Sequence, residues 1–505
     1  MQKQRFVTRV RVTVALCVLV ALFIIGRLYY LQIIQGHLYA ARADSQLTKP
    51  VNTLLLRDSI YLSDKEGNLV LAATLEAGAT SSVRQRYYPG GSLAAQEIGF
   101  VAYNENKLEG RYGLERYYEQ TLAREQEELY SNFFVELFGA ARAVLGGEPT
   151  TGDVITTLEP TVQAELERTL EDYDKEWNPR LSGGIIMDPK TGEVVGMAMH
   201  PTFDLNAFNK EKTTSIFANA LVENVYEMGS IIKPLTVAAG LDSGVITPQT
   251  TYNDTGEITL DQKTIRNFDG RARGVVDMQQ ILSQSLNLGV SFIAQKMGPE
   301  KMREYFLDKY KLGVESGIDL PGEVHGLMSG LQSPRRVEYS TASFGQGIAM
   351  TPIETVRALA TLANGGKLVT PHLAKAIRYD TGYTHELSWP MDEQVLQPQT
   401  STQISRMLTE VVDKALLEGK IKLDRYSVAA KTGTAQIANP NGGGYYADRF
   451  LHSFFGYFPS FDARFIVFLF AVEPVGAPYA SQTLARPFNA LTQFLISYYD
   501  IPPDR

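Results

Sequence analysis

A serine followed three residues later by a lysine occurs once in this chain of 505 residues, at Ser230-Ile-Ile-Lys233. A serine hydroxyl is a weak nucleophile and needs an adjacent base. Residues three apart on a helix lie on the same face, so Lys233 could be that base if burial or a nearby cation lowers its pKa. The pair predicts nucleophilic catalysis by serine, although a serine at the start of a helix can also be an ordinary N-cap.

A second short sequence, Ser285-Leu-Asn287, is the only S-x-N in the chain and precedes a predicted helix. Ser285 could relay a proton between Lys233 and a leaving amine, and the Asn287 amide could hold a peptide group of a substrate. Taken alone, the two residues are better explained as helix caps. The catalytic interpretation depends on the motifs that accompany them.

The sequence K-T-G occurs twice, at 190–192 and at 431–433, which gives an internal comparison. The first copy lies in a predicted hairpin turn, where glycine satisfies the backbone geometry. The second copy continues a predicted strand over 426–430, and a strand with a lysine, hydroxyls and a glycine can bind a peptide carboxylate. We therefore assign the first copy to structure and the second to the candidate site, with the residues Lys431, Thr432, Gly433 and Thr434.

The two lysines of the candidate site have different predicted roles. Lys431 would supply the cation that lowers the pKa of Lys233, and Lys233 would act as the base. The backbone N–H groups of Ser230 and Thr434 could form an oxyanion hole for the reacting carbonyl.

S-x-x-K, S-x-N and K-T-G in this order form a motif set known from penicillin-binding proteins and class A β-lactamases. The chain resembles the class B, monofunctional penicillin-binding transpeptidases. The resemblance extends over nearly the whole chain, through further segments at residues 27–36, Tyr88-Pro89-Gly90, 110–115, 267–270, 344–347 and 452–459.

The resemblance implies a chemistry for these residues. Ser230 would attack the penultimate D-Ala carbonyl of a peptidoglycan stem peptide and expel D-Ala. An amine of a neighbouring stem peptide would then take the acyl group, which forms a cross-link in cell wall synthesis. β-Lactams would acylate the same serine as inhibitors. The resemblance implies no cofactor, and it implies a polytopic membrane glycosyltransferase and other cell-wall machinery as partners.

Three positions depart from the family pattern. Met228 stands where the family usually has proline, and Leu286 stands at the variable position of a motif that often reads S-S-N. The family's Arg-Gly strand motif reads Arg57-Asp58, and few residues separate it from Tyr88-Pro89. The pedestal domain is therefore predicted to be short.

Alternative functions remain open from the sequence. A D,D-carboxypeptidase uses the same acylation with water as the acceptor, and a non-catalytic β-lactam sensor or scaffold would keep the pocket alone. A bifunctional class A enzyme would need a glycosyltransferase domain, for which residues 44–180 are too short. A β-lactamase would need neither an anchor nor a pedestal. The sequence does not distinguish a role in division from one in elongation.

The N-terminal segment predicts a single membrane anchor. Residues 12–34 are largely apolar and long enough to cross about 30 Å of hydrocarbon. Four basic residues precede them, which predicts a cytoplasmic N-terminus and an extracytoplasmic catalytic domain at the cell membrane. A cleaved signal peptide is the competing interpretation, but its only A-x-A-like site, at 41–43, lies far beyond the apolar run.

Charge and composition exclude several classes of protein. Residues 1–43 carry six basic and no acidic residues, so the rest of the chain has a net charge of −14 within a total of −8. No basic excess remains for a nucleic-acid binder. The single cysteine, Cys17, lies in the apolar segment and excludes an internal disulfide. The six histidines are scattered without metal-ligand spacing, so we predict no metal site.

The order of predicted elements indicates an α+β fold with an antiparallel sheet flanked by helices. A hairpin over 184–199 and strands at 426–436, 453–458 and 465–472 place strands at both ends of the last domain, with a mainly helical region over 229–420 between them. Further helices are predicted over 161–173 and 482–499, and an apolar helical stretch over 116–145. The predicted domains are a cytoplasmic tail (1–11), a transmembrane anchor (12–34), a shortened mixed pedestal (35–180) and a transpeptidase domain (181–505).

Overall fold

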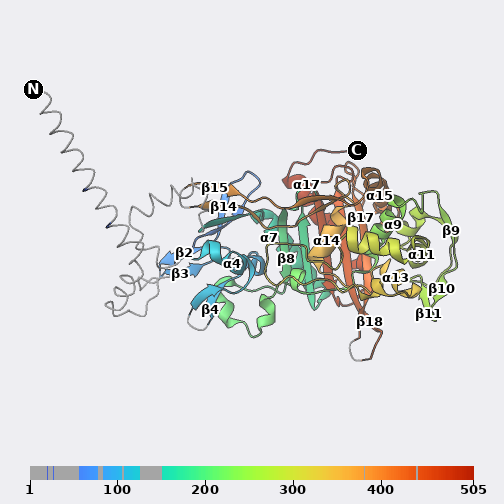
Figure 1. Ribbon diagram of the computed structural model, residues 1–505, viewed down its shortest axis with the longest axis horizontal. Coiled ribbons are helices and arrows are strands. Elements are labelled where there is room, and N and C mark those ends of the chain that lie inside the picture. The colour runs from blue at the N-terminus through green and yellow to red at the C-terminus, as the bar shows by residue number, and fades with distance from the viewer. Residues whose placement is uncertain are drawn as a thin grey trace, which may run out of the picture. The chain divides into compact units, whose positions relative to one another are not determined.

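The hydrophobic runs on either side of residues 188–192 form a β-hairpin in the computed structural model of the protein (Figure 1). Its strands are β7 (Leu181–Met187) and β8 (Val194–His200). Gly192 in the turn has φ +87°, and a Cβ there would lie 2.2 Å from the Thr370 carbonyl oxygen. The first K-T-G copy therefore serves the backbone geometry of a turn, as predicted.

The structure describes residues 20, 27, 56–77, 84–104, 107–124, 151–379, 382–439 and 442–505. Residues 56–76 and 84–505 belong to one compact unit, and the second unit comprises residues 1–55 and 77–83. In the described part of the chain, no helix has both the length and the apolar character needed to span a membrane. Nearly all of the predicted anchor, 12–34, and the predicted helical stretch beyond residue 124 lie outside the described residues.

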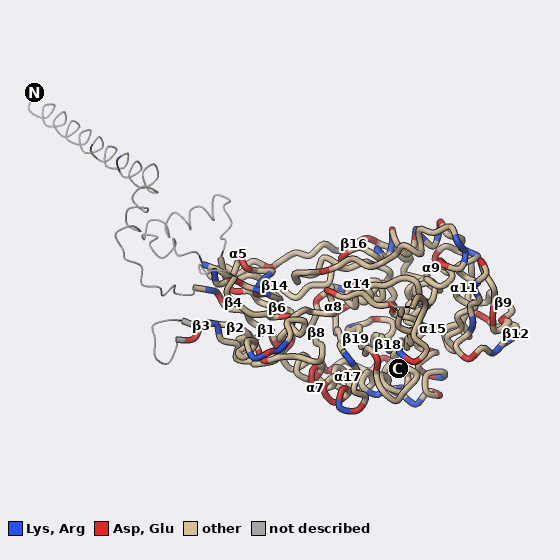
Figure 2. Tube along the Cα trace, turned by 90° about the horizontal axis from the view of Figure 1, so that it is seen from below, with Lys and Arg blue, Asp and Glu red and all other residues tan. Residues whose placement is uncertain are grey.

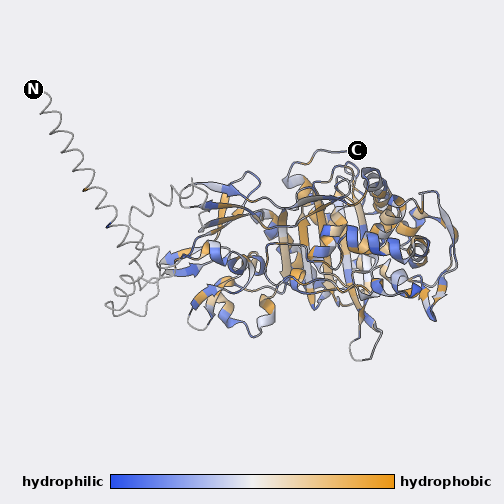
Figure 3. Ribbon diagram, in the orientation of Figure 1, coloured by the Kyte–Doolittle hydropathy of each residue, from blue (hydrophilic) through white to orange (hydrophobic). Residues whose placement is uncertain are grey.

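A five-stranded antiparallel sheet joins the two ends of the last predicted domain. Its order is β17-β18-β19-β7-β8, with β17 (Ala429–Ala438), β18 (Tyr445–Phe458) and β19 (Phe465–Val472) from the C-terminal end. The prediction of one sheet built from both ends is confirmed. Every residue of β7 and β19 is buried, so both faces of these strands are covered. The central strands of the molecule are largely hydrophobic in Figure 3.

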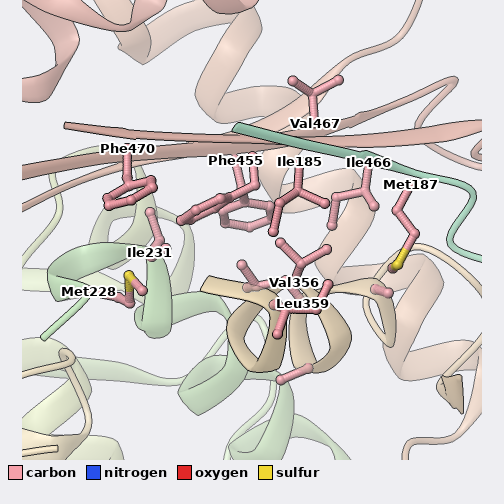
Figure 4. Close-up of a cluster of buried hydrophobic side chains, with 14 of the residues drawn as sticks. Ile185, Met187, Met228, Ile231, Val356, Leu359, Phe455, Ile466, Val467 and Phe470 are labelled. Atoms are coloured by element: carbon pink, nitrogen blue, oxygen red, sulfur yellow. The ribbon is translucent and has the colours of Figure 1, made fainter. Parts of the chain in front are cut away.

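Helices cover both faces of this sheet. On one face, Phe488 of α17 (Ala485–Tyr498) stacks on Phe454 at 4.4 Å, and α7 (Pro160–Trp177) packs beside it against β8. On the other face, α14 (Pro352–Ala360) contacts β19. Figure 4 shows the apolar contact on that second face, where α14 and the segment just before and after Ser230 meet the strands through Ile185, Met228, Ile231, Val356, Leu359, Phe455 and Phe470.

The region between the two ends of the sheet differs from the prediction. Among its described residues it contains the expected helices and also eight strands of three to six residues. These strands were not predicted from the sequence, because such short strands show too little alternation of polar and apolar residues to be recognised. Besides α14, the longer helices are α9 (Lys233–Asp242), α10 (Met278–Ser283), α11 (Asn287–Arg303), α13 (Arg336–Ala342) and α15 (Pro398–Glu410). The strands are β9 (Thr251–Asp254), β10 (Glu257–Leu260), β11 (Lys263–Arg266), β12 (Gly274–Asp277), β13 (Lys367–Val369), β14 (Ala374–Tyr379), β15 (Thr384–Glu386) and β16 (Met391–Gln394).

A second sheet has the order β15-β14-β6-β1-β2-β3. Four of its strands precede residue 157, namely β1 (Ile60–Ser63), β2 (Leu69–Ala77), β3 (Arg84–Tyr87) and β6 (Gly152–Thr156). Strands β14 and β15 join it from residues 374–386, so two distant parts of the chain build one sheet. The same part of the chain also forms a small hairpin and three short helices. The hairpin strands are β4 (Val101–Asn104) and β5 (Lys107–Gly110), and the helices are α3 (Ala95–Ile98), α4 (Gly113–Tyr117) and α5 (Glu119–Leu122).

A buried ionic network ties the N-terminal strands to these helices. Glu115 is fully buried and accepts hydrogen bonds from Arg57 at 2.5 Å and from Arg86 at 2.6 Å. The hydroxyl of Tyr88 donates to the same carboxylate at 3.3 Å. Two of the segments quoted for the family resemblance, Tyr88-Pro89-Gly90 and 110–115, therefore meet at one carboxylate with Arg57 of the departing Arg57-Asp58 motif. Elsewhere in the described part, basic and acidic residues are interspersed along the chain (Figure 2).

Candidate active site

Ser230 lies in a 3-10 turn, Gly229–Ile232, that leads directly into α9. Its neighbours Met228 and Ile231 are buried against the five-stranded sheet, which fixes the turn on the sheet surface. Neither the turn nor α9 begins with a side-chain cap hydrogen bond, so Ser230 is not the N-cap that the sequence allowed as an alternative. The residue is half-buried and remains accessible from solvent.

The two lysines of the predicted site meet at Ser285. Lys233 Nζ donates to the Ser285 carbonyl oxygen at 2.5 Å and to the Ser285 hydroxyl at 3.1 Å. Lys431 Nζ donates to the same hydroxyl at 3.0 Å and to the Thr432 carbonyl oxygen at 3.0 Å. The tertiary structure therefore brings together all three motifs, although they lie far apart in the sequence.

Burial shifts the pKa values of both lysines in the direction that the predicted base requires. The pKa of Lys233 lies well below its ordinary value because the side chain is fully buried and because Lys431 is a nearby like charge. Burial also lowers the pKa of Lys431 to about 7. Because the like charge acts on Lys233 in addition to burial, we assign Lys233 as the member of the pair that loses its proton first.

Ser285 is held in an unusual backbone conformation between α10 and α11. Its φ is +54°, a left-handed value that residues other than glycine rarely adopt. In this conformation both its carbonyl oxygen and its hydroxyl point to Lys233. Local strain of this kind is common where a site is organised before substrate binds.

The second K-T-G copy lies on β17, which is an outer strand of its sheet. A Cβ at Gly433 would lie 2.3 Å from the Ser453 hydroxyl and 2.7 Å from the Met228 carbonyl oxygen. The absence of a side chain therefore allows β17 to lie directly against the residue pair that precedes Ser230. The free edge of an outer strand can pair with an extended peptide.

The remaining predicted residues flank these groups. Thr432 and Thr434 pair with Phe454 and His452 of β18, and the Thr434 hydroxyl accepts a hydrogen bond from the Ala480 N–H at 3.1 Å. Asn287 is the first residue of α11, and its Nδ2 donates to the Arg266 carbonyl oxygen at 2.9 Å. The Lys190 ammonium of the first K-T-G copy pairs instead with Asp462 at an exposed turn.

Several residues around the site were missed from the sequence. Glu227, three residues before Ser230, accepts hydrogen bonds from the Gly347 N–H at 3.0 Å and the Tyr445 hydroxyl at 3.1 Å. Asp254 pairs with Asn267, whose segment was noted only for its resemblance. No local spacing signals such contacts, because they join residues 13 to 218 positions apart. Within the described ranges, no group of three or more His, Cys, Asp or Glu side chains is arranged to hold a metal ion.

Comparison with known proteins identifies the family. The model of the penicillin-binding protein transpeptidase domain matches residues 183–493, which is more than half of the chain. The chain belongs to this family. Its relatives are class B penicillin-binding proteins, in agreement with the resemblance inferred from the sequence.

Two curated relatives illustrate the range of the class B family. Stage V sporulation protein D of Bacillus subtilis is 30% identical over 438 residues, which is 84% of this chain and 66% of the relative. The chain therefore spans slightly less than two thirds of that protein's length. Peptidoglycan D,D-transpeptidase FtsI of Buchnera aphidicola is 24% identical over 83% of this chain and 71% of the relative.

A solved structure agrees with the fold of this class B penicillin-binding protein. Penicillin-binding protein 3 of Mycobacterium tuberculosis, complexed with aztreonam, superposes with a TM-score of 0.77 at 25% identity. The comparison covers 90% of this chain and 98% of the other. A second structure of the same mycobacterial protein holds ampicillin.

Proposed function

We propose that this class B penicillin-binding protein is a serine D,D-transpeptidase that cross-links peptidoglycan stem peptides and is acylated by β-lactams. The observation that carries the proposal is the Ser285 hydroxyl with Lys233 on one side and Lys431 on the other, next to the turn of Ser230. The names of the relatives and the β-lactam complexes of the mycobacterial neighbour support the substrate class.

In acylation, neutral Lys233 takes the proton of the Ser230 hydroxyl while Oγ forms a bond to the penultimate D-Ala carbonyl carbon. The carbonyl oxygen becomes an oxyanion, for which the backbone N–H groups of Ser230 and Thr434 are the proposed donors. The C–N bond then breaks, and the leaving D-Ala amine receives the proton from Lys233 through the Ser285 hydroxyl. The products are an ester on Ser230 and free D-Ala.

In deacylation, the amine of a second stem peptide attacks the ester carbon and transfers its proton to Lys233. The C–Oγ bond breaks, and the Ser230 oxygen takes this proton from Lys233, so the serine is again a hydroxyl and Lys233 is again neutral. Lys431, Thr432, Gly433 and Thr434 line the edge of β17 and would bind the donor peptide and its terminal carboxylate. Asn287 would hold a peptide group on the opposite side.

Labelling with a fluorescent penicillin tests the proposal. We expect a covalent adduct on the wild type and none on Ser230→Ala. Absence of an adduct on the folded wild type would refute the catalytic assignment. With polymerised lipid II as substrate, cross-linked products support transpeptidation, whereas release of D-Ala without cross-links indicates a D,D-carboxypeptidase.

A matched serine pair tests the relay. Ser285→Ala removes the hydroxyl between the lysines and should slow acylation by about 10²-fold or more. The control is Ser283→Ala, whose hydroxyl instead accepts a hydrogen bond from Gln279 at 3.0 Å. Equal acylation rates in the two variants would exclude Ser285 from proton transfer.

We infer a single-pass protein at the cell membrane, with the domains 1–11, 12–34, 35–180 and 181–505 as tail, anchor, pedestal and catalytic domain. The apolar run and the basic residues before it support this topology. Protease treatment of intact spheroplasts should remove the domain that labels with penicillin, while protection of that domain would contradict the topology. A polytopic glycosyltransferase is the proposed partner, and crosslinking from the anchor segment tests it.

A further inference from the structure

The N-terminus of α11, the helix that begins with Asn287, has no cap of its own. The preceding residue, Leu286, has an apolar side chain and forms no cap hydrogen bond. Serine is a preferred capping residue, but the Ser285 hydroxyl lies between the two lysines instead. The first N–H groups of an α-helix need partners from outside the helix. At this position α11 therefore depends on another part of the chain.

The outside partner is a pair of residues at the end of the β10–β11 hairpin, the last residue of β11, Arg266, and the next residue, Asn267. Asn267 Oδ1 accepts a hydrogen bond from the Leu288 N–H at 3.3 Å. The carbonyl oxygen of the adjacent Arg266 accepts one from Asn287 Nδ2 at 2.9 Å. Two consecutive residues therefore hold both the first turn of α11 and the side chain of Asn287.

A buried carboxylate fixes the orientation of Asn267. Asn267 and Asp254 are 2% and 1% exposed, and Asn267 Nδ2 lies 3.0 and 2.9 Å from the two Asp254 oxygens. The Gly256 N–H donates to Asp254 Oδ1 at 2.9 Å. Because an amide presents its donors and its acceptor at opposite ends, the side that faces Asp254 must be Nδ2, and the oxygen then faces Leu288.

We propose that Asp254 and Asn267 are positioning residues that hold Asn287 in the orientation needed to bind the donor peptide. The inference rests on the proposed transpeptidase function. It explains why the catalytic motif tolerates an apolar residue before Asn287: the capping group comes from Asn267, so Ser285 can contact the lysines. Asp254 acts through Asn267, and Asn267 acts through Arg266 and Leu288.

Variants of Asn267 and Asp254 test the positioning role. The measured quantity is the rate of acylation by a fluorescent penicillin per folded molecule. Asn267→Ala removes the cap and should slow acylation roughly ten- to hundredfold, as expected for a misplaced binding group. Asn267→Asp places two carboxyls together. At low pH one shared proton can replace the Nδ2 donor, but at higher pH the two charges repel. The ratio of variant to wild-type rate should therefore fall as pH rises.

The double variant Asp254→Asn/Asn267→Asp restores one amide and one carboxylate, and its rate should return to near the wild-type value at all pH values. Other groups near the pair are Arg273 and Tyr252, which interact electrostatically with Asp254, and Arg266, which pairs with Glu257 at 2.8 Å. Because each variant rate is divided by the wild-type rate at the same pH, the titration of Lys233 and Lys431, which is common to both proteins, does not affect the comparison.

Asn219→Asp is the matched control. Asn219 is also buried and donates to a buried carboxylate, Glu97, at 2.9 Å, but the N-terminus that it caps is that of α8 (Ala220–Glu223) and not that of α11. This variant should lower the melting temperature and leave the rate ratio independent of pH.

The outcomes separate this inference from the proposed function. The positioning role would be overturned if the ratio of the Asn267→Asp rate to the wild-type rate did not change with pH. It would also be overturned if Asn267→Ala were acylated at the wild-type rate. A double variant that melts like the wild type and stays slow would also overturn it. If the double variant does not fold, the pH dependence of the Asn267→Asp rate, relative to the wild type, tests the positioning role. A wild type that forms no penicillin adduct refutes the proposed function itself.

Discussion

Lys233 and Lys431 donate hydrogen bonds to one oxygen atom, the hydroxyl of Ser285, from 3.1 and 3.0 Å. Two buried ammonium groups around one neutral hydroxyl repel each other, and burial already disfavours their charge. The arrangement is stable when one of them is neutral. The pKa of Lys233 is lowered by burial and by the like charge of Lys431, so we assign Lys233 as the neutral member, which is the state that a general base requires.

Replacing Lys431 should change the pH dependence of acylation. In Lys431→Met the like charge near Lys233 is lost, so the pKa of Lys233 rises although burial still lowers it. The acidic limb of the acylation rate should then move to higher pH. Lys190→Met, in the turn copy of K-T-G, is the control and should keep the wild-type profile. An unchanged acidic limb in Lys431→Met would show that Lys431 does not act on Lys233.

A methyl group at Gly433 should disturb the contact between β17 and the Ser230 turn. Its Cβ would lie 2.3 Å from the Ser453 hydroxyl, so one element must move, at a cost of about 1–3 kcal/mol. We expect Gly433→Ala to lower the melting temperature and to slow penicillin acylation. In Gly442→Ala the new Cβ meets only the side-chain amide of Asn439, at 3.2 Å. Equal melting temperatures and equal acylation rates of the two variants would contradict the close contact between β17 and the Ser230 turn.

The Glu115 carboxylate should stabilise the sheet of β1, β2 and β3. Burial favours its neutral form, but Arg86 and Arg57 hold its pKa below the ordinary value. Its stabilising effect is therefore present above the unfolded-state pKa and is lost as pH falls through the folded-state pKa. Glu115→Gln takes the charge partner from the buried Arg86 and leaves Arg57 with only Glu119, at 2.7 Å, which we expect to cost about 3–5 kcal/mol. Urea unfolding at several pH values measures both effects.

For that experiment Glu109→Gln is the control, because its pair with Arg111 is partly exposed and lies at 3.4 Å. We expect it to change the free energy of unfolding by less than about 1 kcal/mol. A loss of similar size in both variants would argue against the buried network.

His200 should stabilise the end of β8 at mildly acidic pH. A hydrogen bond to Asp174 at 2.5 Å raises the pKa of His200. The stabilisation is fully present below the unfolded-state pKa, about 6.5, and is lost as pH rises through the folded-state value. Because the ring is one third exposed, we expect less than about 1 kcal/mol. Comparison of His200→Gln with the exposed His385→Gln by thermal melting from pH 5 to 9 checks this, and identical pH profiles would contradict it.

Local patterns in the sequence were sufficient to predict the candidate site residues and the outline of the fold. The residues Ser230, Lys233, Ser285, Asn287 and Lys431 follow from local motifs, and their order was sufficient to identify the family. The central sheet followed too, because β7, β8 and β19 are long hydrophobic runs with strong strand propensity. The apolar segment at 12–34 predicts a membrane anchor, and this anchor stays a prediction.

The contacts between these residues could be seen only once the chain was folded. The contacts of Ser285 with Lys233 and Lys431 span 52 and 146 residues, and no periodicity encodes such a distance. The strands β9 to β16 were missed because three to six residues carry too little pattern. The cap of α11 by Asn267 could not be predicted for a related reason. A helix is normally capped by a residue next to it, but here the nearby Ser285 accepts hydrogen bonds from the two lysines, and Asn267 caps the helix instead.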